Sequence, residues 1–225
     1  MYYSYITELD LSSKDLTELP DLSMFVSLVK LNCSNNQLTK LSNLPPNIKY
    51  LYCGYNQITH LDNLPSNIEI LHCYYNKITR LDNLSPKLRE LYCNMNRITH
   101  LDNLPLNLDI LICSNNKLSE LNNLPINLRY LECEKNKLLH LDNLPSKLKY
   151  LECQYNEITQ MDNLPPCLKK LSCFENYIRQ LDNLPNNLES LYCMTNLITR
   201  LNNLPPNLKD LFCYNNPLIY DFEPN

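Results

Sequence analysis

Cysteine is the residue type with the most regular spacing in this chain of 225 residues. Ten of the eleven cysteines recur every 20 residues, from Cys33 to Cys213, and the eleventh is Cys167. Thiols can form disulfides, bind zinc or sense redox state. Equivalent residues of parallel strands lie about 4.8 Å apart, too far for bridged Cβ atoms, and no C-x-x-C pair is present. We interpret the ten as reduced, buried small hydrophobes, with zinc or redox sensing as the alternative, and Cys167 as the most reactive thiol.

Histidine and aspartate are the other residue types that could bind a metal. His60, His100 and His140 share one position of the 20-residue unit but occur in every second unit, which places them roughly 10 Å apart and too far for one ion. Six aspartates at another shared position could hold Ca²⁺, but basic residues two positions earlier balance their charge more simply. The six are Asp62, Asp82, Asp102, Asp142, Asp162 and Asp182. The sequence therefore predicts no metal and no cofactor.

No group of residues has the spacing of a catalytic site. There is no nucleophile–base pair and no zincin helix, and one glycine, Gly54, cannot build a glycine-rich phosphate loop. We predict that the protein is not an enzyme. Its net charge of -4 gives no reason to expect a nucleic acid or an anionic membrane as the partner.

The chain shows no signal for membranes or export. No apolar run approaches the ~20 residues that span a bilayer. The first residues, Met-Tyr-Tyr-Ser-Tyr-Ile-Thr-Glu, lack the basic region and the apolar core of a signal peptide. We predict a cytoplasmic protein that is not secreted by a classical signal peptide.

The cysteine spacing belongs to a longer repeat. Leucine precedes each of the ten cysteines by two residues and asparagine follows each by three, which gives the pattern L-x-x-L-x-C-x-x-N-x-I. We predict one continuous domain with ten repeats over residues 31–216. Residues 1–30 would form a cap with a degenerate first repeat and one helical turn, and residues 217–225 a second cap, since terminal units must cover the core.

The repeat also predicts the elements that position these residues. Each unit directs six apolar side chains inward, and the segment around Leu-x-Cys should be a short strand paired in parallel with its copies. Proline at a shared position disfavours helix on the opposite side, which should be extended and polyproline-like. Asn36 and its equivalents should form a ladder of amides that satisfies backbone groups of adjacent turns.

The unit resembles the leucine-rich repeat, and Leu-Pro followed by Asn-Leu is similar to the short 20-residue class of effector proteins that enteric pathogens deliver into host cells. The resemblance covers residues 9–216. Cysteine in the strand, Asp-Asn where the effectors often have Pro-Glu, and a composition typical of AT-rich genomes most resemble the repeat proteins of giant viruses that infect amoebae. The resemblance implies a fold that is α/β by superfamily but mostly β and extended. That fold is a right-handed solenoid with a concave parallel sheet of about 11 short strands and a polyproline-like convex side.

Function should lie where the repeat does not dictate the residue. Four columns of side chains, two in the strand and two just beyond it, should face the concave side, and they hold 11 of the 16 tyrosines. Such a surface suits protein recognition, although tyrosine also tolerates exposed strand positions without binding anything. The predicted partner-binding residues are Tyr50, Tyr52, Tyr55, His72, Tyr74, Tyr75, Tyr92, Met95, Ile110, Ile112, Tyr130, Tyr150, Phe174, Tyr192, Phe212 and Tyr214.

The sequence therefore predicts a protein-interaction module that binds a partner, such as a host protein, along its concave face. An acidic centre of Glu132, Glu134 and Glu152 favours a partner with a basic segment. The alternative is a structural protein, a self-assembling scaffold or a virion-associated component. A binding module should be a monomer, whereas a scaffold should self-associate.

Overall fold

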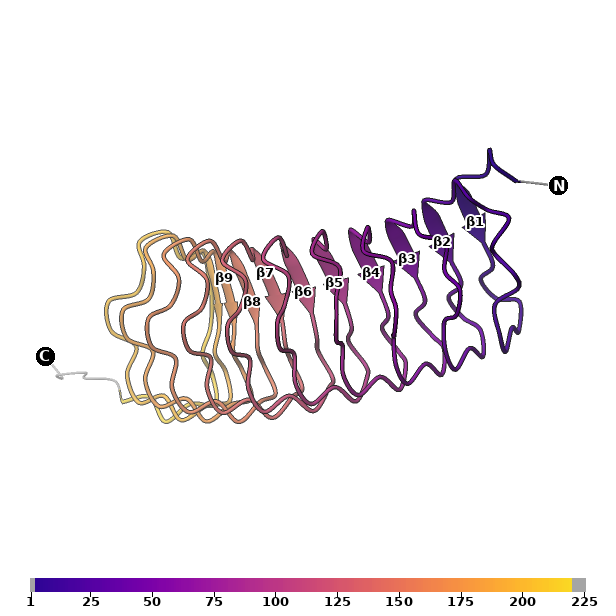
Figure 1. The fold of residues 1–225 in the computed structure, drawn as a ribbon. Coiled ribbons are helices and arrows are strands. Elements are labelled where there is room, and N and C mark those ends of the chain that lie inside the picture. Colours follow the sequence, from indigo (N-terminus) through magenta and orange to yellow (C-terminus); the bar gives the residue numbers. More distant parts are fainter. Residues whose placement is uncertain (1–2, 220–225) are drawn as a thin grey trace, which may run out of the picture.

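The computed structural model describes residues 3–219, in which eleven three-residue strands form one parallel sheet. The strands are β1 (Glu8–Asp10), β2 (Lys30–Asn32), β3 (Tyr50–Tyr52), β4 (Ile70–His72), β5 (Glu90–Tyr92), β6 (Ile110–Ile112), β7 (Tyr130–Glu132), β8 (Tyr150–Glu152), β9 (Lys170–Ser172), β10 (Ser190–Tyr192) and β11 (Asp210–Phe212). They follow one another in sequence order, each turn of the chain contributing one strand (Figure 1). The predicted parallel solenoid of about 11 short strands is confirmed.

The register keeps equivalent residues of successive turns side by side. Leu31 pairs with Leu51 and Leu51 with Leu71, so the repeat spacing in the sequence becomes a column of identical side chains in space. In most strands the central leucine is buried and its two neighbours are half-buried. The alternation follows from the pleat, which directs successive side chains to opposite faces of the sheet.

The core is a single apolar column that runs along the stack. In the turn of residues 71–90, Leu71, Cys73, Ile78 and Leu88 are fully buried and Leu81 is 5% exposed, as predicted. Leu84, the sixth side chain predicted to point inward, is only partly buried. Burying one large aliphatic side chain contributes roughly 1.5–3 kcal/mol. No turn can bury its apolar side chains alone, so the stability of each depends on its neighbours.

The convex side contains no helix within residues 3–219, and its extended path is bent at two points in each turn. An asparagine such as Asn43 adopts a left-handed conformation, with φ of 54°. Five residues later the N–H of Ile48 donates to the carbonyl of Pro45 at 3.4 Å and closes a tight turn. Asparagine tolerates positive φ better than other residues with a side chain, which explains its recurrence there.

The helical turn predicted in the N-terminal cap is wrong. The N–H of Phe25 donates to the carbonyl of Leu22 at 3.0 Å, and the N–H of Leu28 to the carbonyl of Phe25 at 3.1 Å. These bonds close two successive tight turns that share only Phe25, whereas a helix needs overlapping bonds from consecutive residues. Tyr3 stacks on Phe25 with ring centroids 5.1 Å apart. Most of the predicted C-terminal cap lies outside the described residues.

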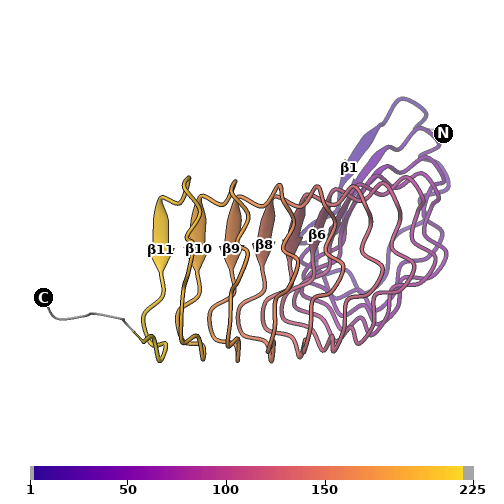
Figure 2. The ribbon, with the colours of Figure 1, turned by 90° about the vertical axis from the view of Figure 1, so that its left-hand side faces the viewer.

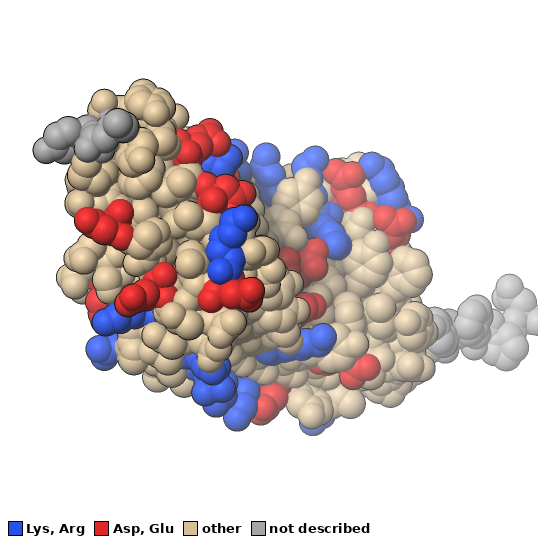
Figure 3. Space-filling view, turned by 90° about the vertical axis from the view of Figure 1, so that its right-hand side faces the viewer, with Lys and Arg blue, Asp and Glu red and all other residues tan. Residues whose placement is uncertain are grey.

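The stack of turns is twisted along its length. In Figure 2, β11 and β10 stand upright while β1 is strongly inclined, so strand direction rotates from one end to the other. Such rotation is the expected twist of a β-sheet. In an end-on view the surface is hollowed between the N-terminal and C-terminal ends of the solenoid (Figure 3).

Candidate binding surface

Six aromatic rings from the turns of β3, β4 and β5 lie in mutual contact on the exposed side of the sheet. This aromatic cluster consists of Tyr52, Tyr55, His72, Tyr74, Tyr75 and Tyr92. His72 is central, with ring centroids 4.8 Å from Tyr52, 4.1 Å from Tyr92 and 6.0 Å from Tyr74. Tyr55 stacks on Tyr75 at 4.4 Å and meets Tyr74 edge-on at 5.4 Å. The structure thus brings together six of the predicted binding residues.

The aromatic cluster rests on the only glycine of the chain. A Cβ atom at Gly54 would lie 3.0 Å from two ring carbons of Tyr74, a tighter contact than most Cβ atoms make, so the ring would have to shift. The Tyr74 ring therefore occupies the space that a side chain at position 54 would fill. Equivalent positions in other turns carry side chains, such as Ser114 and Gln154. The sequence shows Gly54 as an isolated exception, but its role needs the structure.

Tyr55 and Tyr75 hold backbone conformations that tyrosine rarely adopts. Their φ values are 52° and 51°, and the same position is left-handed in every later turn. Asn35, Asn115 and Asn215 meet this requirement at low cost, whereas most other residues lose roughly 1–2 kcal/mol. Strained backbone is often retained at functional sites. Tyr55 and Tyr75 are retained in spite of this strain, as are Met95, Lys135, Glu175 and Thr195 in other turns.

Two members of the aromatic cluster, His72 and Tyr92, have pKa values shifted toward their neutral forms. Burial lowers the pKa of His72, which favours its neutral form. Burial also raises the pKa of Tyr92, with a further contribution from Glu90, whose carboxylate accepts a hydrogen bond from the Tyr92 hydroxyl at 3.3 Å. Tyr55 and Tyr75 are 48% and 41% exposed, so their rings are open to a partner.

The acidic centre of the sheet is occupied by internal contacts. Glu132 accepts a hydrogen bond from Ser114 at 3.1 Å, and Glu134 accepts one from Gln154. Glu152 pairs with Lys170 at 2.8 Å. Burial raises the pKa of Glu132. Only Glu152 is paired with a cation, since the donors to Glu132 and Glu134 are neutral, and the basic partner segment that the sequence suggested stays a prediction.

The remaining predicted residues form two further groups and a connecting stretch. Tyr130 and Tyr150 pack at 5.8 Å beside the acidic centre, and burial raises the pKa of Tyr130. Tyr192 stacks on Phe212 at 5.2 Å near the exposed Tyr214. The connecting residues that are half-buried are Tyr50, Met95, Ile110 and Ile112. The predicted surface is thus several groups and not one continuous patch.

Only one residue of a further aromatic pair, Phe174, was among the predicted binding residues. Phe174 packs edge-on against Tyr155 at 5.2 Å, and Lys135 places its Nζ 5.4 Å from the centre of the Tyr155 ring. Tyr155 belongs to one of the four columns predicted to face the concave side, at the same repeat position as Tyr55 and Tyr75, but was not included among the predicted binding residues.

The cysteine column lies in the core, which confirms its predicted burial. Nine of the ten repeat cysteines are buried, Cys213 is partly buried, and Cys167 is exposed. Burial raises the pKa of Cys33 to about 12 and raises the pKa of the deeper thiols as well. Neutral thiols are poor nucleophiles and poor metal ligands. The column therefore acts as packing material, as the regular repeat suggested.

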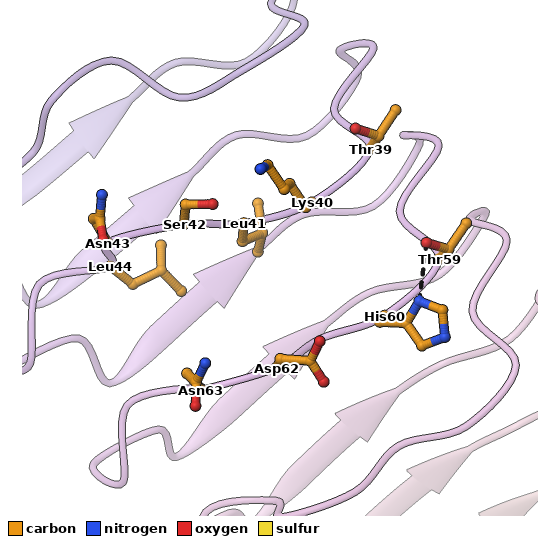
Figure 4. Close-up of a pocket in the computed structure, with 10 residues that line it drawn as sticks. All are labelled: Thr39, Lys40, Leu41, Ser42, Asn43, Leu44, Thr59, His60, Asp62 and Asn63. Atoms are coloured by element: carbon orange, nitrogen blue, oxygen red, sulfur yellow. Dashed lines mark hydrogen bonds between the residues drawn. The ribbon is translucent and has the colours of Figure 1, made fainter.

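The convex side carries an open hollow of about 680 Å³ between the turns of β2 and β3 (Figure 4). His60 interacts with Thr59 through Nδ1 at 3.1 Å, while Lys40 and Ser42 come from the preceding turn. The labelled side chains are spread over the two turns and do not converge on one point. Residues 3–219 contain no group of three or more His, Cys, Asp or Glu that could hold a metal. No helix in that range could cross a membrane.

The fold and its repeat-coded surface define a right-handed leucine-rich-repeat solenoid, as the sequence resemblance implied. The chain is similar to the functional domain of InlJ from Listeria monocytogenes, which includes a cysteine ladder, with 31% identity and a TM-score of 0.80 over 96% of this chain and 55% of that one. It is also similar to YopM from Yersinia enterocolitica, with 30% identity and a TM-score of 0.66 over 96% of this chain and 56% of that one. A Shigella effector leucine-rich-repeat domain is 28% identical, with a TM-score of 0.59 over 76% of this chain and 71% of that one.

The chain spans little more than half the length of the InlJ and YopM chains, 55% and 56%. No protein-family model and no curated protein sequence matches it. The neighbours support the 20-residue repeat class that the sequence resembles. They do not support the resemblance to viral repeat proteins.

Proposed function

We propose that this chain is a protein-interaction module and not an enzyme, and that it binds a protein partner through the concave face of its sheet. The aromatic cluster is the principal contact. The observation that carries the proposal is the arrangement of three tyrosines. Tyr55 and Tyr75 are exposed rings held in left-handed backbone, and Tyr74 is seated over the only glycine. Aromatic anchors of this kind dominate the affinity of protein interfaces.

The aromatic cluster sets the chemistry of its partner. Its rings are uncharged, so the matching surface should present apolar or aromatic side chains with hydrogen-bond acceptors for the tyrosine hydroxyls. The half-buried Met95, Ile110 and Ile112 extend the contact along the sheet. The groups around Tyr130 and Tyr192 provide secondary contacts toward the C-terminal turns.

The buried thiols and the structural neighbours support a cellular location and a class of partner. Stacked buried thiols suit a reducing compartment such as the cytoplasm. The effector among the structural neighbours favours a partner in a host cell. We propose a monomer that acts as one continuous domain, with caps at 1–30 and 217–225 around ten repeats at 31–216.

The experiment is affinity capture from cell lysate with the wild type and a Tyr55→Asn/Tyr75→Asn variant, followed by titration of the recovered protein in purified form. Asparagine suits the left-handed backbone, and this gain offsets the lost ring stacking, so the variant should remain folded. We expect its affinity to be weaker by roughly 1000-fold, because two anchors at about 2 kcal/mol each are removed.

A matched control is Tyr5→Asn/Tyr177→Asn, which removes two exposed tyrosines outside the aromatic cluster. This control should bind as the wild type does. Equal binding by all three proteins would contradict the proposal. If the wild type captures no partner and instead self-associates at micromolar concentration, a scaffold role replaces it.

A further inference from the structure

One edge of the solenoid carries an uninterrupted row of cations. Lys77, Arg97, Lys117 and Lys137 occupy the same repeat position in four consecutive turns, one residue after the buried asparagine ladder. Lys135 lies two positions before Lys137. All five side chains are exposed, and together they are called the basic edge. With turns about 4.8 Å apart, the row of four spans roughly 15 Å.

The basic edge is not neutralised by neighbouring carboxylates. None of the ion pairs found within residues 3–219 includes any of its five members. The Nζ of Lys77 donates to the side-chain oxygen of Gln57 at 3.0 Å, which is a neutral acceptor. A protein with a net charge of -4 thus keeps five cations together with no carboxylate paired to any of them in the described residues.

In another column of the same solenoid, charged side chains are paired with charges of opposite sign. Two positions before each strand leucine, charges of opposite sign pair between turns, as Lys49 with Glu69 at 3.0 Å and Arg129 with Asp109 at 3.3 Å. Glu189 lies between two lysines at 3.1 and 2.7 Å. On the face drawn in Figure 3, basic and acidic side chains are likewise interspersed. The basic edge departs from this arrangement.

A shallow, open depression of about 600 Å³ lies beside part of the basic edge. Its wall includes Lys77, Arg97 and Lys135 together with the side chains of Tyr75 and Met95. The cations therefore border two large side chains, Tyr75 and Met95, set among asparagines. The backbone amides beneath them are already used between turns, as in the bond from the Lys77 N–H to the Ile58 carbonyl at 2.9 Å. A ligand would be recognised by side chains, chiefly through charge.

We propose that the basic edge binds an extended, acidic peptide segment that runs along the solenoid axis. Aspartate or glutamate carboxylates would face Lys77, Arg97, Lys117 and Lys137, and intervening side chains would lie over Tyr75 and Met95. The row ends at Gln57 on one side and at Glu157 on the other, so it suits a short anionic segment. A continuous polyanion such as a nucleic acid would extend past the row and meet Glu157, which repels it.

The test is fluorescence anisotropy with a labelled dodecapeptide of alternating glutamate and serine. We expect saturable binding to the wild type that weakens with added salt, because surface charges are screened. Lys77→Gln/Arg97→Gln/Lys117→Gln should weaken binding about tenfold, since each exposed pair contributes up to about 1 kcal/mol. The control Lys40→Gln/Lys149→Gln/Arg200→Gln removes the same charge from other exposed sites and should change affinity less than about twofold.

Three outcomes would overturn this inference. They are no binding by the wild type, equal weakening in both triple variants, and tighter binding of an oligothymidylate of similar length than of the acidic peptide. The probe carries no apolar side chain, so the result does not depend on the aromatic cluster. Failure here would leave the proposed function standing, and failure of the tyrosine experiment would leave the basic edge standing.

Discussion

Asn96 illustrates how one buried amide links two turns of the solenoid. Its Nδ2 donates to the carbonyls of Cys73 and Cys93, both at 3.0 Å, and its Oδ1 accepts from the N–H of Ile78 at 3.0 Å. The same contacts recur at Asn56, Asn76 and the later members of the ladder. The chain needs such side chains because short strands leave backbone groups between them without partners.

We predict that Asn96→Ala destabilises the protein by about 3 kcal/mol, because it leaves the buried N–H of Ile78 without an acceptor and removes the donors from two carbonyls. Urea unfolding followed by circular dichroism measures this loss. Asn107→Ala is the matched control, since exposed Asn107 makes one bond, to the Pro86 carbonyl at 3.2 Å. Its cost should stay below about 1 kcal/mol. Equal losses at both sites would contradict the structural role of the ladder.

Thr195 shows the cost of the left-handed position in another residue type. Its φ is 53°, a conformation that a β-branched side chain adopts with difficulty. We predict that Thr195→Asn stabilises the protein by about 1 kcal/mol, because asparagine tolerates this backbone. Thr199→Asn, at an exposed position outside the left-handed set, should change stability by less than about 0.5 kcal/mol. A destabilised Thr195→Asn protein would remove strain as an argument for Tyr55 and Tyr75.

At the scale of the strands, packing between neighbouring turns decides what each side chain can do. Gly54 in the turn of β3 and Tyr74 in the turn of β4 occupy one volume, since a Cβ on the first would lie 3.0 Å from the ring of the second. The glycine is not in a left-handed conformation. Glycine is therefore favoured at position 54 because the Tyr74 ring of the neighbouring turn leaves little room for a side chain, and not because of the backbone conformation.

This coupling predicts a change of sign in a double-mutant cycle. Gly54→Ala should destabilise the wild type by about 1–2 kcal/mol, because the Tyr74 ring must move. In a Tyr74→Ala background the same change should stabilise by about 0.5 kcal/mol, because alanine restricts the unfolded chain. Urea unfolding of the four proteins measures the coupling. Destabilisation of equal size in both backgrounds would show that Gly54 does not serve Tyr74.

The cysteine column gives the solenoid a dependence on alkaline pH. Unfolded thiols ionise near their ordinary pKa of 9.0, whereas burial keeps folded thiols neutral, with the pKa of Cys33 raised to about 12. Above about pH 9 the unfolded state holds fewer protons than the folded state, so stability falls as pH rises toward 12. Well below pH 9 the thiols are neutral in both states, so the buried cysteines make their full contribution to the free energy of unfolding.

We predict that the urea midpoint falls between about pH 8 and about pH 10, and that it falls less in Cys93→Ala/Cys113→Ala. Tyrosines and lysines titrate equally in both proteins, so the difference in slope isolates the two thiols. The double variant should be less stable at about pH 8, because it loses buried volume. Identical slopes would mean that these thiols ionise in the folded state.

At the scale of the whole molecule, the repeat allows much of the fold to be predicted. The constant spacing of Leu31, Cys33 and Asn36 with their copies predicts the strand count, the parallel register, the buried thiols and the asparagine ladder, because equal spacing must become stacking when each turn contributes one strand. The twist visible in Figure 2 is a cumulative rotation that no single unit encodes as a residue type.

The candidate site was harder to predict, because it depends on contacts between turns. The sequence places Tyr55, Tyr74 and Tyr75 in adjacent columns, but their ring geometry and the left-handed backbone follow only from the folded chain. A second amide ladder on the convex side, in which Asn67 donates to the Pro46 carbonyl at 3.2 Å, was also missed. Its signal is asparagine two residues after the repeat proline.

Amide hydrogen exchange of this protein, with and without the purified protein recovered by affinity capture, tests the central claim most directly. The concave-face account predicts that added protection concentrates in residues 50–95, which carry the aromatic cluster, and that Tyr55→Asn/Tyr75→Asn abolishes it. Exchange resolved by peptide fragments covers all turns in one experiment. Protection confined to the convex turns or to the strands after β8, with residues 50–95 unchanged, would contradict the account.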